Sequence, residues 1–178
     1  MIDAFEAGYA AGVKSVDPKM TVDVQYANSF TDAAKGKTIA NAMITKCEQV
    51  IFHAAGNGVF TAAKDNNVTV DADAKQKVWV IGVDMDQSDI GDYTAKDGEK
   101  SNFTLTSSVK GVGTGLALIA DKAKVGNFPG GKHIVLGLKQ NGVSIVTKNL
   151  NAQEKDAVAS AKAAIVSGDV EVPTTPAK

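Results

Sequence analysis

The sequence predicts an α/β fold built on a parallel β-sheet, and three observations support this prediction. Short apolar segments typical of strands alternate with segments whose apolar residues recur at helical spacing. The segment 78–83 is a continuous apolar run, which is typical of a parallel strand covered on both faces. The loops between these segments are short. A strand–helix–strand–helix–strand order of this kind predicts parallel strands joined by right-handed crossovers.

The elements of the first half follow from the spacing of the apolar residues. Apolar residues recur every three or four positions over residues 2–16, which predicts an amphipathic helix. Polar and apolar residues alternate over 21–26, which predicts a half-buried strand. Thr31 or Asp32 is expected to cap the helix that follows. The remaining elements are, in order, a helix over 33–46, a strand over 49–53, a helix over 58–65 and a strand over 78–83.

The regular order ends after Asp84, where a polar, irregular segment runs to residue 101. A short strand is predicted over 102–106 and a helix over 111–125. Asn141-Gly142 lies between two apolar runs, which predicts a hairpin over 132–146. A last helix is expected over 151–166, capped by Asn151 and ended by Gly168. The helix 111–125 and the hairpin do not extend the first sheet, so we expect them to belong to a neighbouring lobe.

The composition excludes several classes of protein. The 178 residues carry a net charge of −1, and all 19 basic residues are lysines, which argues against nucleic-acid binding. No apolar run approaches the ~20 residues of a membrane-spanning helix. Cys47 is the only cysteine, so no internal disulfide can form, and we expect a packed thiol. Without a leader or a lipid-attachment cysteine near the N-terminus, the chain is either cytoplasmic or lacks the segment that would address it.

Polar groups follow three of the predicted strands at the point where each strand ends. The glycine loop 56–58 follows the first, Asp84 follows the second, and Lys110 comes shortly after the third. An α/β sheet binds small molecules at the carboxyl ends of its strands. A glycine loop, a carboxylate and an ammonium group suit a hydroxyl-rich ligand better than covalent catalysis.

Each of these groups also has a structural alternative. The loop 56–58 is either a tight strand-to-helix turn or a close approach of backbone to ligand. Asp84 either caps a turn or accepts two hydrogen bonds from a diol. Asp84 and Asp86 together would suit acid–base chemistry or a metal, but no further converging ligands are evident, so no metal or cofactor is expected. Lys110 is either solvated or a ligand group.

Three ring-bearing side chains remain. Phe30 lies in a polar loop, where it either packs on the next helix or stacks on a flat ligand ring. His53 and His133 lie in predicted strands, far apart in sequence, and both are expected to be structural. No serine–histidine–aspartate or cysteine–histidine arrangement is evident, so no catalytic residue is predicted.

Several stretches together resemble the basic membrane protein family of substrate-binding lipoproteins, which serve ABC transporters and are often purine-nucleoside receptors. The most specific stretch is the Gly-Val-Asp-Met-Asp-Gln run at 82–87, with an Ala-Ala-Gly loop before it. The resemblance implies a type I periplasmic-binding-protein fold with two lobes. The matching stretches are 5–13, 29–32, 51–58, 81–87, 105–110 and 135–143.

The resemblance implies roles for four residues of this sequence. Phe30 matches the position that stacks on the nucleobase, and Gly56, Asp84 and Lys110 match those that hold the ribose. The spacing between Asp84 and Lys110 is longer than in typical members, because residues 88–101 include additional polar residues.

The resemblance also implies a division of the chain. Residues 1–108 would form the second, C-terminal lobe. Residues 109–178 would supply a crossover helix, a hairpin and a final helix that belong partly to an incomplete first lobe. The chain would then be a truncated form. Its full-length counterpart would be lipid-anchored at the cell surface and would meet an ABC permease. An apolar stripe of Val112, Leu116, Ile119 and Ala123 would be left uncovered. We therefore expect the truncated chain to self-associate, to exchange these elements with a second copy, or to pack them on its own sheet.

We therefore expect a non-enzymatic protein that binds a purine nucleoside when two lobes close on it. One alternative is an enzyme that processes nucleosides or sugars with Asp84 or Asp86 as the base. The other is an interaction module that binds no solute, since half a site lacks the enclosure of a ligand pocket.

Overall fold

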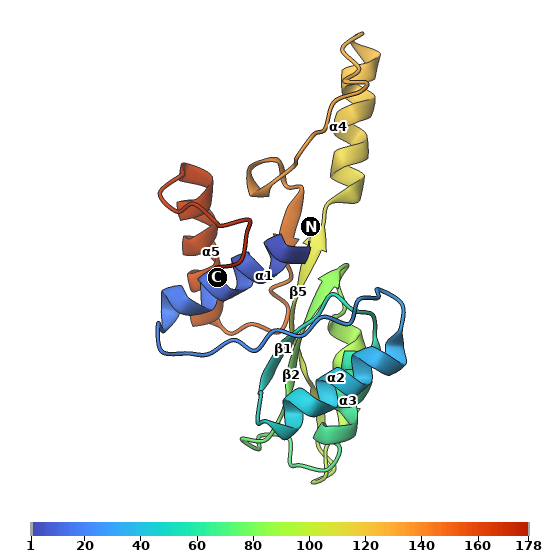
Figure 1. Ribbon diagram of the computed structural model, residues 1–178, viewed down its shortest axis with the longest axis vertical. Coiled ribbons are helices and arrows are strands. Elements are labelled where there is room, and N and C mark those ends of the chain that lie inside the picture. The colour runs from blue at the N-terminus through green and yellow to red at the C-terminus, as the bar shows by residue number, and fades with distance from the viewer. Residues whose placement is uncertain (1, 178) are drawn as a thin grey trace.

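A computed structural model describes residues 2–177. Met1 begins the predicted segment 1–108 and Lys178 ends the predicted segment 109–178, and both residues lie outside the described part of the chain. Its main sheet has four strands in the order β1-β2-β5-β6 (Figure 1). The first three strands run parallel and β6 runs antiparallel to β5, which confirms the predicted α/β fold on a parallel sheet. These strands are β1 (Val50–Phe52), β2 (Trp79–Asp84), β5 (Thr104–Lys110) and β6 (Val143–Ile145).

The described part of the chain has five α-helices, of which α4 projects away from the sheet (Figure 1). Their bounds agree with the five predicted helices to within two residues at each end. None is long and apolar enough to cross a membrane. The helices are α1 (Ile2–Val16), α2 (Ala33–Thr45), α3 (Gly58–Asn67), α4 (Val112–Lys124) and α5 (Ala152–Ser167).

Helices α2 and α3 bury one face of the parallel strands, and the core lies between them and the sheet. The ring of Phe103 is fully buried there, 6.0 Å from the ring centroid of Phe60 and 5.6 Å from that of Tyr93. On the opposite face, Phe52 packs against Phe5 and Tyr9 of α1. The core residues are Ala40, Ile51, Val59, Phe60, Ala62, Ala63, Ala72, Val78, Val80, Tyr93, Ala95 and Phe103.

The helix ends form as their side chains predict. Asp32, rather than Thr31, caps α2, because its carboxylate accepts a hydrogen bond from the Lys35 amide at 2.9 Å. Asn151 and Glu154 form a reciprocal capping box at the start of α5. Gly168 ends this helix with φ 90°, a left-handed conformation that glycine adopts without steric cost.

The predicted strand over 21–26 is wrong, because this segment belongs to neither sheet. Side chains hold it against the helices instead. The Tyr26 hydroxyl donates a hydrogen bond of 2.5 Å to Glu6 on α1, and Lys46 forms a 2.8 Å ion pair with Asp23. The alternating sequence meets the requirement for a strand, but the segment forms no ladder with the edge strand β1, which is only three residues long.

The polar segment after Asp84 is more ordered than its sequence predicts. It contains the short 3₁₀ helix η1 (Ser88–Gly91) and a two-stranded antiparallel ribbon of β3 (Asp92–Thr94) and β4 (Lys100–Asn102). Each strand has only three residues, too few for an apolar alternation to be visible. The next strand, β5, runs from Thr104 to Lys110 rather than over 102–106, so Lys110 ends this strand instead of following it.

The predicted hairpin over 132–146 is also wrong. Residues 132–137 form no strand, and β6 pairs with β5 instead. The turn at Asn141 does form, with φ 53°, but it follows a 3₁₀ helix, η2 (Leu138–Gln140). The Asn-Gly signal therefore identified the turn. The strand that follows the turn, β6, pairs with β5, which lies far away in the sequence. His133, expected in a strand, is exposed in this irregular segment.

Cys47 is exposed, so the prediction of a packed thiol is wrong. Its φ of 68° places it in the left-handed region just beyond α2. A residue in that conformation turns the chain away from the helix end, and here the turn carries the side chain outward.

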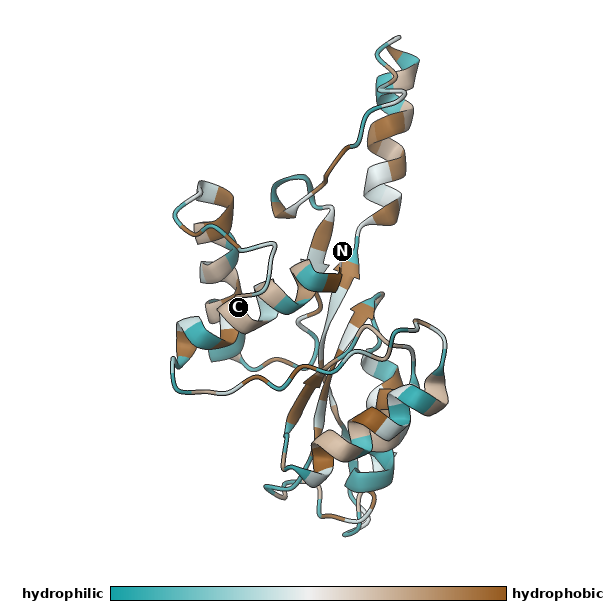
Figure 2. Ribbon diagram, in the orientation of Figure 1, coloured by the Kyte–Doolittle hydropathy of each residue, from teal (hydrophilic) through white to brown (hydrophobic). Residues whose placement is uncertain are grey.

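The apolar face of α4 is largely exposed, although Ile119 is half-buried. No residue of this helix is buried, and Figure 1 shows it projecting away from the sheet. The exposed fractions of Val112 and Leu116 are 65% and 68%, and Val125 and Phe128 beyond the helix are exposed to a similar extent. Figure 2 shows these apolar segments without a covering layer. Neighbouring exposed apolar side chains of this kind commonly mark an interaction surface.

His53 is a polar residue buried in the core, as its predicted structural role requires. Its ring is 4% exposed and meets Phe60 edge-on at 5.2 Å, and neither ring nitrogen has a hydrogen-bond partner of acceptable geometry among the described residues. Burial lowers the pKa of His53 below its ordinary value of 6.5, and Gln87 and Asp84 oppose this effect only in part.

His53 should make the protein less stable in mild acid. Its pKa is lower in the folded chain than in the unfolded one, so the unfolded chain binds the proton more strongly as the pH falls below about 6.5. The free energy of unfolding should therefore fall between about pH 7 and pH 5. Denaturant unfolding of wild type and His53→Leu across this range measures the effect. The decrease should shrink in His53→Leu and persist in His133→Asn, and equal slopes in all three proteins would contradict it.

The exposed stripe of α4 should cause self-association. Light scattering on the wild-type chain should give a mass above that of a monomer, increasing with concentration, because association covers apolar surface. Leu116→Lys, in the centre of the stripe, should reduce this mass. Ala117→Lys adds the same charge about 100° around the helix from Leu116, outside the stripe, and should change the mass less. A wild-type chain that remains monomeric at high concentration would contradict this prediction.

Candidate ligand-binding site

The ladder of the parallel sheet brings two predicted site residues together. Asp84 lies beside Val109 in the register of β2 and β5, so Lys110 is one residue beyond. Its ammonium nitrogen lies 2.6 Å from Asp84 Oδ1, and the two side chains are 42% and 59% exposed. The carboxylate and the ammonium group thus face solvent as one pair at the carboxyl ends of the strands, where α/β sheets bind ligands.

Asp84 has an unusual backbone conformation. Its φ is 72°, in the left-handed region that residues other than glycine rarely adopt. Strand β2 ends at this residue, and the chain turns there into the loop that leads to η1. Backbone strain of this kind is common at ligand sites, where it aims a side chain.

The glycine loop packs closely against the Phe30 segment. Gly56 has φ 74°, and a Cβ there would lie 3.0 Å from the carbonyl oxygen of Phe30. A Cβ on Gly58 would collide with the carbonyl of Ala33 at the start of α2. Both glycines therefore permit a close approach of two backbone segments.

Phe30 is 67% exposed, which favours a ligand contact over packing on the next helix. It lines a cavity of about 680 Å³ between α1, residues 20–30 and the end of β1. Phe5 lines the same cavity, and the Lys110 ammonium lies 5.6 Å from the centre of its ring. The cavity therefore extends from Phe30 toward the Asp84–Lys110 pair, although neither member of the pair lines it.

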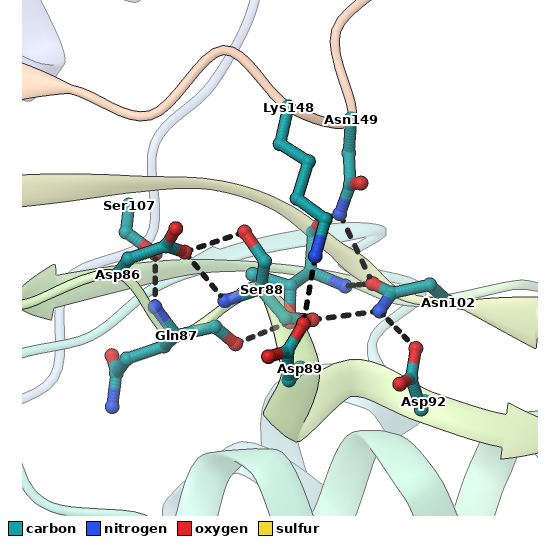
Figure 3. A network of polar contacts seen from close by, with 10 residues as sticks. Asp86, Gln87, Ser88, Asp89, Asp92, Asn102, Ser107, Lys148 and Asn149 are labelled. Carbon is teal, nitrogen blue, oxygen red and sulfur yellow. Dashed lines mark hydrogen bonds and ion pairs between the residues drawn. The ribbon is translucent and has the colours of Figure 1, made fainter.

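Asp86 does not join Asp84. Its carboxylate accepts hydrogen bonds from the amide and the hydroxyl of Ser88, at 2.9 Å and 2.5 Å, which lower its pKa (Figure 3). A carboxylate engaged in this way is a poor general base. Within residues 2–177, no three histidine, cysteine, aspartate or glutamate side chains converge to hold a metal ion.

Gln87 is a further residue near the site, and its role was not evident from the sequence. It is buried. Its backbone N–H donates to the Ser107 hydroxyl at 3.1 Å, and its side-chain Oε1 accepts from the backbone N–H of Val83 at 2.8 Å. Figure 3 shows Gln87 within a polar network that continues through η1 to Lys148 and Asn149. A glutamine in a polar loop is not part of any apolar spacing pattern, so its burial becomes evident only in the folded structure.

Comparison with known proteins finds a matching family. Residues 1–175 match the Bmp family model, described as ABC transporter substrate-binding protein PnrA-like. The ABC transporter nucleoside-binding protein BmpA of Lactococcus lactis is 50% identical over 98% of this chain. Basic membrane protein A of Borreliella afzelii is 33% identical over 97% of it. In both cases the chain spans 50% of the relative's length.

Solved structures share the fold. An ABC transporter solute-binding protein from Conexibacter woesei superposes with a TM-score of 0.68 at 17% identity, over 97% of this chain and 53% of its own. One from Aeropyrum pernix has a TM-score of 0.66 at 24% identity, over 96% and 53%. The matched family model describes substrate-binding proteins rather than enzymes, which argues against Asp84 or Asp86 as a catalytic base. The chain belongs to the Bmp family of PnrA-like ABC transporter substrate-binding proteins.

Proposed function

We propose that this chain binds a purine nucleoside as part of the solute-binding component of an ABC importer. The observation that carries the proposal is the Asp84–Lys110 pair, exposed at the carboxyl ends of β2 and β5 beside the cavity that Phe30 lines. The name of the Lactococcus lactis relative, which is 50% identical, supports a nucleoside as the ligand class.

The groups at the site match the parts of a nucleoside. One oxygen of Asp84 already faces Lys110, and the carboxylate retains capacity to accept hydrogen bonds from a ribose diol. Lys110 can donate to the same hydroxyl groups. An exposed phenyl ring such as Phe30 offers a flat face to a purine. The cavity volume of about 680 Å³ lies within the range of small-molecule sites.

The proposed site requires two lobes. Residues 1–108 supply Phe30, Gly56 and Asp84, while 109–178 supply Lys110 at the end of β5, the edge strand β6, and α4 and α5, which we assign in part to the other lobe. Because the chain spans about half the length of its relatives, the remaining surface of the site would come from the other half of a full-length protein. Closure of the two lobes would bury the ligand, and the closed form would meet a permease from a lipid-anchored position at the cell surface.

Nuclear magnetic resonance titration tests the proposal, because it detects affinities in the millimolar range. Adenosine, inosine and guanosine are each added to the labelled chain, with ribose and cytidine as comparisons. Purine nucleosides should shift the resonances of Phe30, Gly56, Asp84 and Lys110 in a saturable way. Affinity should be weak because one lobe encloses only part of the ligand. Unchanged resonances at these four residues would refute the proposal, and formation of free base would favour an enzyme.

Asp84→Ala should weaken purine-nucleoside binding by about tenfold or more, because the buried diol would lose a charged acceptor. Asp86→Ala is the matched control. Its carboxylate is engaged by Ser88, so its loss should change affinity little. The same titration measures both dissociation constants. Equal affinities for the wild type and the Asp84 variant would remove Asp84 from the site.

Phe30→Leu should weaken binding, whereas Phe30→Tyr and Phe30→Trp should retain part of the affinity, because stacking requires a flat π-face. Base–aromatic stacking contributes about 1–3 kcal/mol. Melting temperatures of the three variants provide the control. If Phe30→Leu binds normally and melts at a lower temperature, the ring has a packing role instead.

A further inference from the structure

We infer that Gln87 is a positioning residue that holds Asp84 and the glycine loop in their relative positions at the ligand site. The inference rests on the proposed function, since it concerns the same site. Gln87 is 7% exposed, and its side chain contacts two of the segments that form the site. It does not reach the solvent-facing side of the pair itself.

The first contact fixes the end of β2. Oε1 of Gln87 accepts the hydrogen bond from the Val83 N–H at 2.8 Å, one residue before the left-handed turn at Asp84. An unpaired amide at this point would have to be solvated or buried at a cost. The glutamine side chain thus substitutes for a strand partner and stabilises the turn that aims the Asp84 carboxylate.

The second contact reaches the glycine loop. Nε2 of Gln87 donates to Oδ1 of Asn57 at 3.4 Å, a long hydrogen bond. Asn57 precedes α3, but its side chain does not cap that helix. Its amide oxygen is therefore available to Gln87. One side chain in this way links the loop after β1 to the turn after β2.

The sheet itself leaves room for this side chain. A Cβ on Gly82 would lie 2.5 Å from Gln87 Oε1 and 2.7 Å from the Ser107 hydroxyl. The φ of Gly82 is not in the left-handed region. A glycine is therefore needed at this position because a side chain would not fit, and not because of the backbone conformation. Strand β2 thus has a gap in its row of side chains, and Gln87 occupies the gap.

The backbone of Gln87 is hydrogen-bonded to β5, the neighbour of β2 in the sheet. Its N–H donates to Ser107 and its carbonyl accepts from the Thr104 hydroxyl at 3.2 Å, both on β5 (Figure 3). Asn149, beyond β6, donates to the Thr104 carbonyl at 2.7 Å. Gln87 is therefore anchored to β5, and its side chain extends from this anchor to β2 and the loop.

Asn67 provides a matched control at the other end of β2. It is fully buried, and its side chain both accepts from the Val78 N–H and donates to the Val78 carbonyl, each at 2.8 Å. Asn67→Leu and Gln87→Leu each remove a buried amide that bonds to β2. Only the second change lies at the ligand end of the strand.

The experiment compares Gln87→Leu, Gly82→Ala and Asn67→Leu with the wild type. Three quantities are measured on the full chain: the melting temperature, the amide resonances of Asn57 and Asp84, and the affinity for adenosine. Gly82→Ala is included because it displaces the glutamine without removing it. Gln87→Glu is the conservative variant, since its carboxylate still accepts the Val83 hydrogen bond but cannot donate to Asn57 when ionised.

Gln87→Leu and Gly82→Ala should both shift the Asn57 and Asp84 resonances and weaken adenosine binding by about tenfold. Gln87→Glu should retain more affinity than Gln87→Leu. Asn67→Leu should lower the melting temperature and leave the resonances and the affinity unchanged. If Gln87→Leu behaves like Asn67→Leu, the positioning role is wrong. If the wild type binds no nucleoside, the proposed function fails, and the two resonances alone decide for or against Gln87.

Discussion

The parallel ladder between β2 and β5 is the interaction on which the rest of the structure depends. It joins the two longest strands of the sheet, and its register places Lys110 next to Asp84. Parallel strands end at the same edge, so side chains far apart in the sequence meet without a long loop to guide them. The core supports this ladder from one side, since Phe60 of α3 and Phe103 before β5 pack together beneath it.

The two halves of the chain are ordered by different means. Residues up to β5 bury a compact core between α2, α3 and the sheet. Beyond β5 the chain contains three helical segments, α4, η2 and α5, none of which has a buried residue. The second half is attached mainly through backbone pairing of β6 with β5 and through side chains such as Lys148 on Asp89 at 2.7 Å. An element held at one edge by hydrogen bonds and by exposed ion pairs can rotate with little loss of buried apolar surface.

Much of the first half could be predicted from the sequence because local rules and tertiary packing agree there. The apolar run of β2 and the capping residues of α2 and α5 each determine their structure from a few neighbouring residues. The failures arise where a distant partner decides. The segment 21–26 has the alternation of a strand but pairs with no strand, and β6 pairs with β5 instead of with residues 132–138. Asp84 and Lys110 were identifiable as polar groups at strand ends, whereas the burial of Gln87 depends on a gap above Gly82 that no sequence pattern displays.

The register of β2 and β5 changes once, between Val80 and Ile81, where β5 has one additional residue, Leu105, relative to its neighbour. Residues beyond this bulge would all exchange faces of the sheet if that one residue were lost. The ribbon of β3 and β4, by contrast, projects from the connection between the two strands and leaves their ladder unchanged. Natural variation in length should therefore be tolerated within 92–102 and excluded within 104–110. Insertions and deletions in the ribbon can therefore change the number of residues between Asp84 and Lys110, while the distance between the two side chains stays constant.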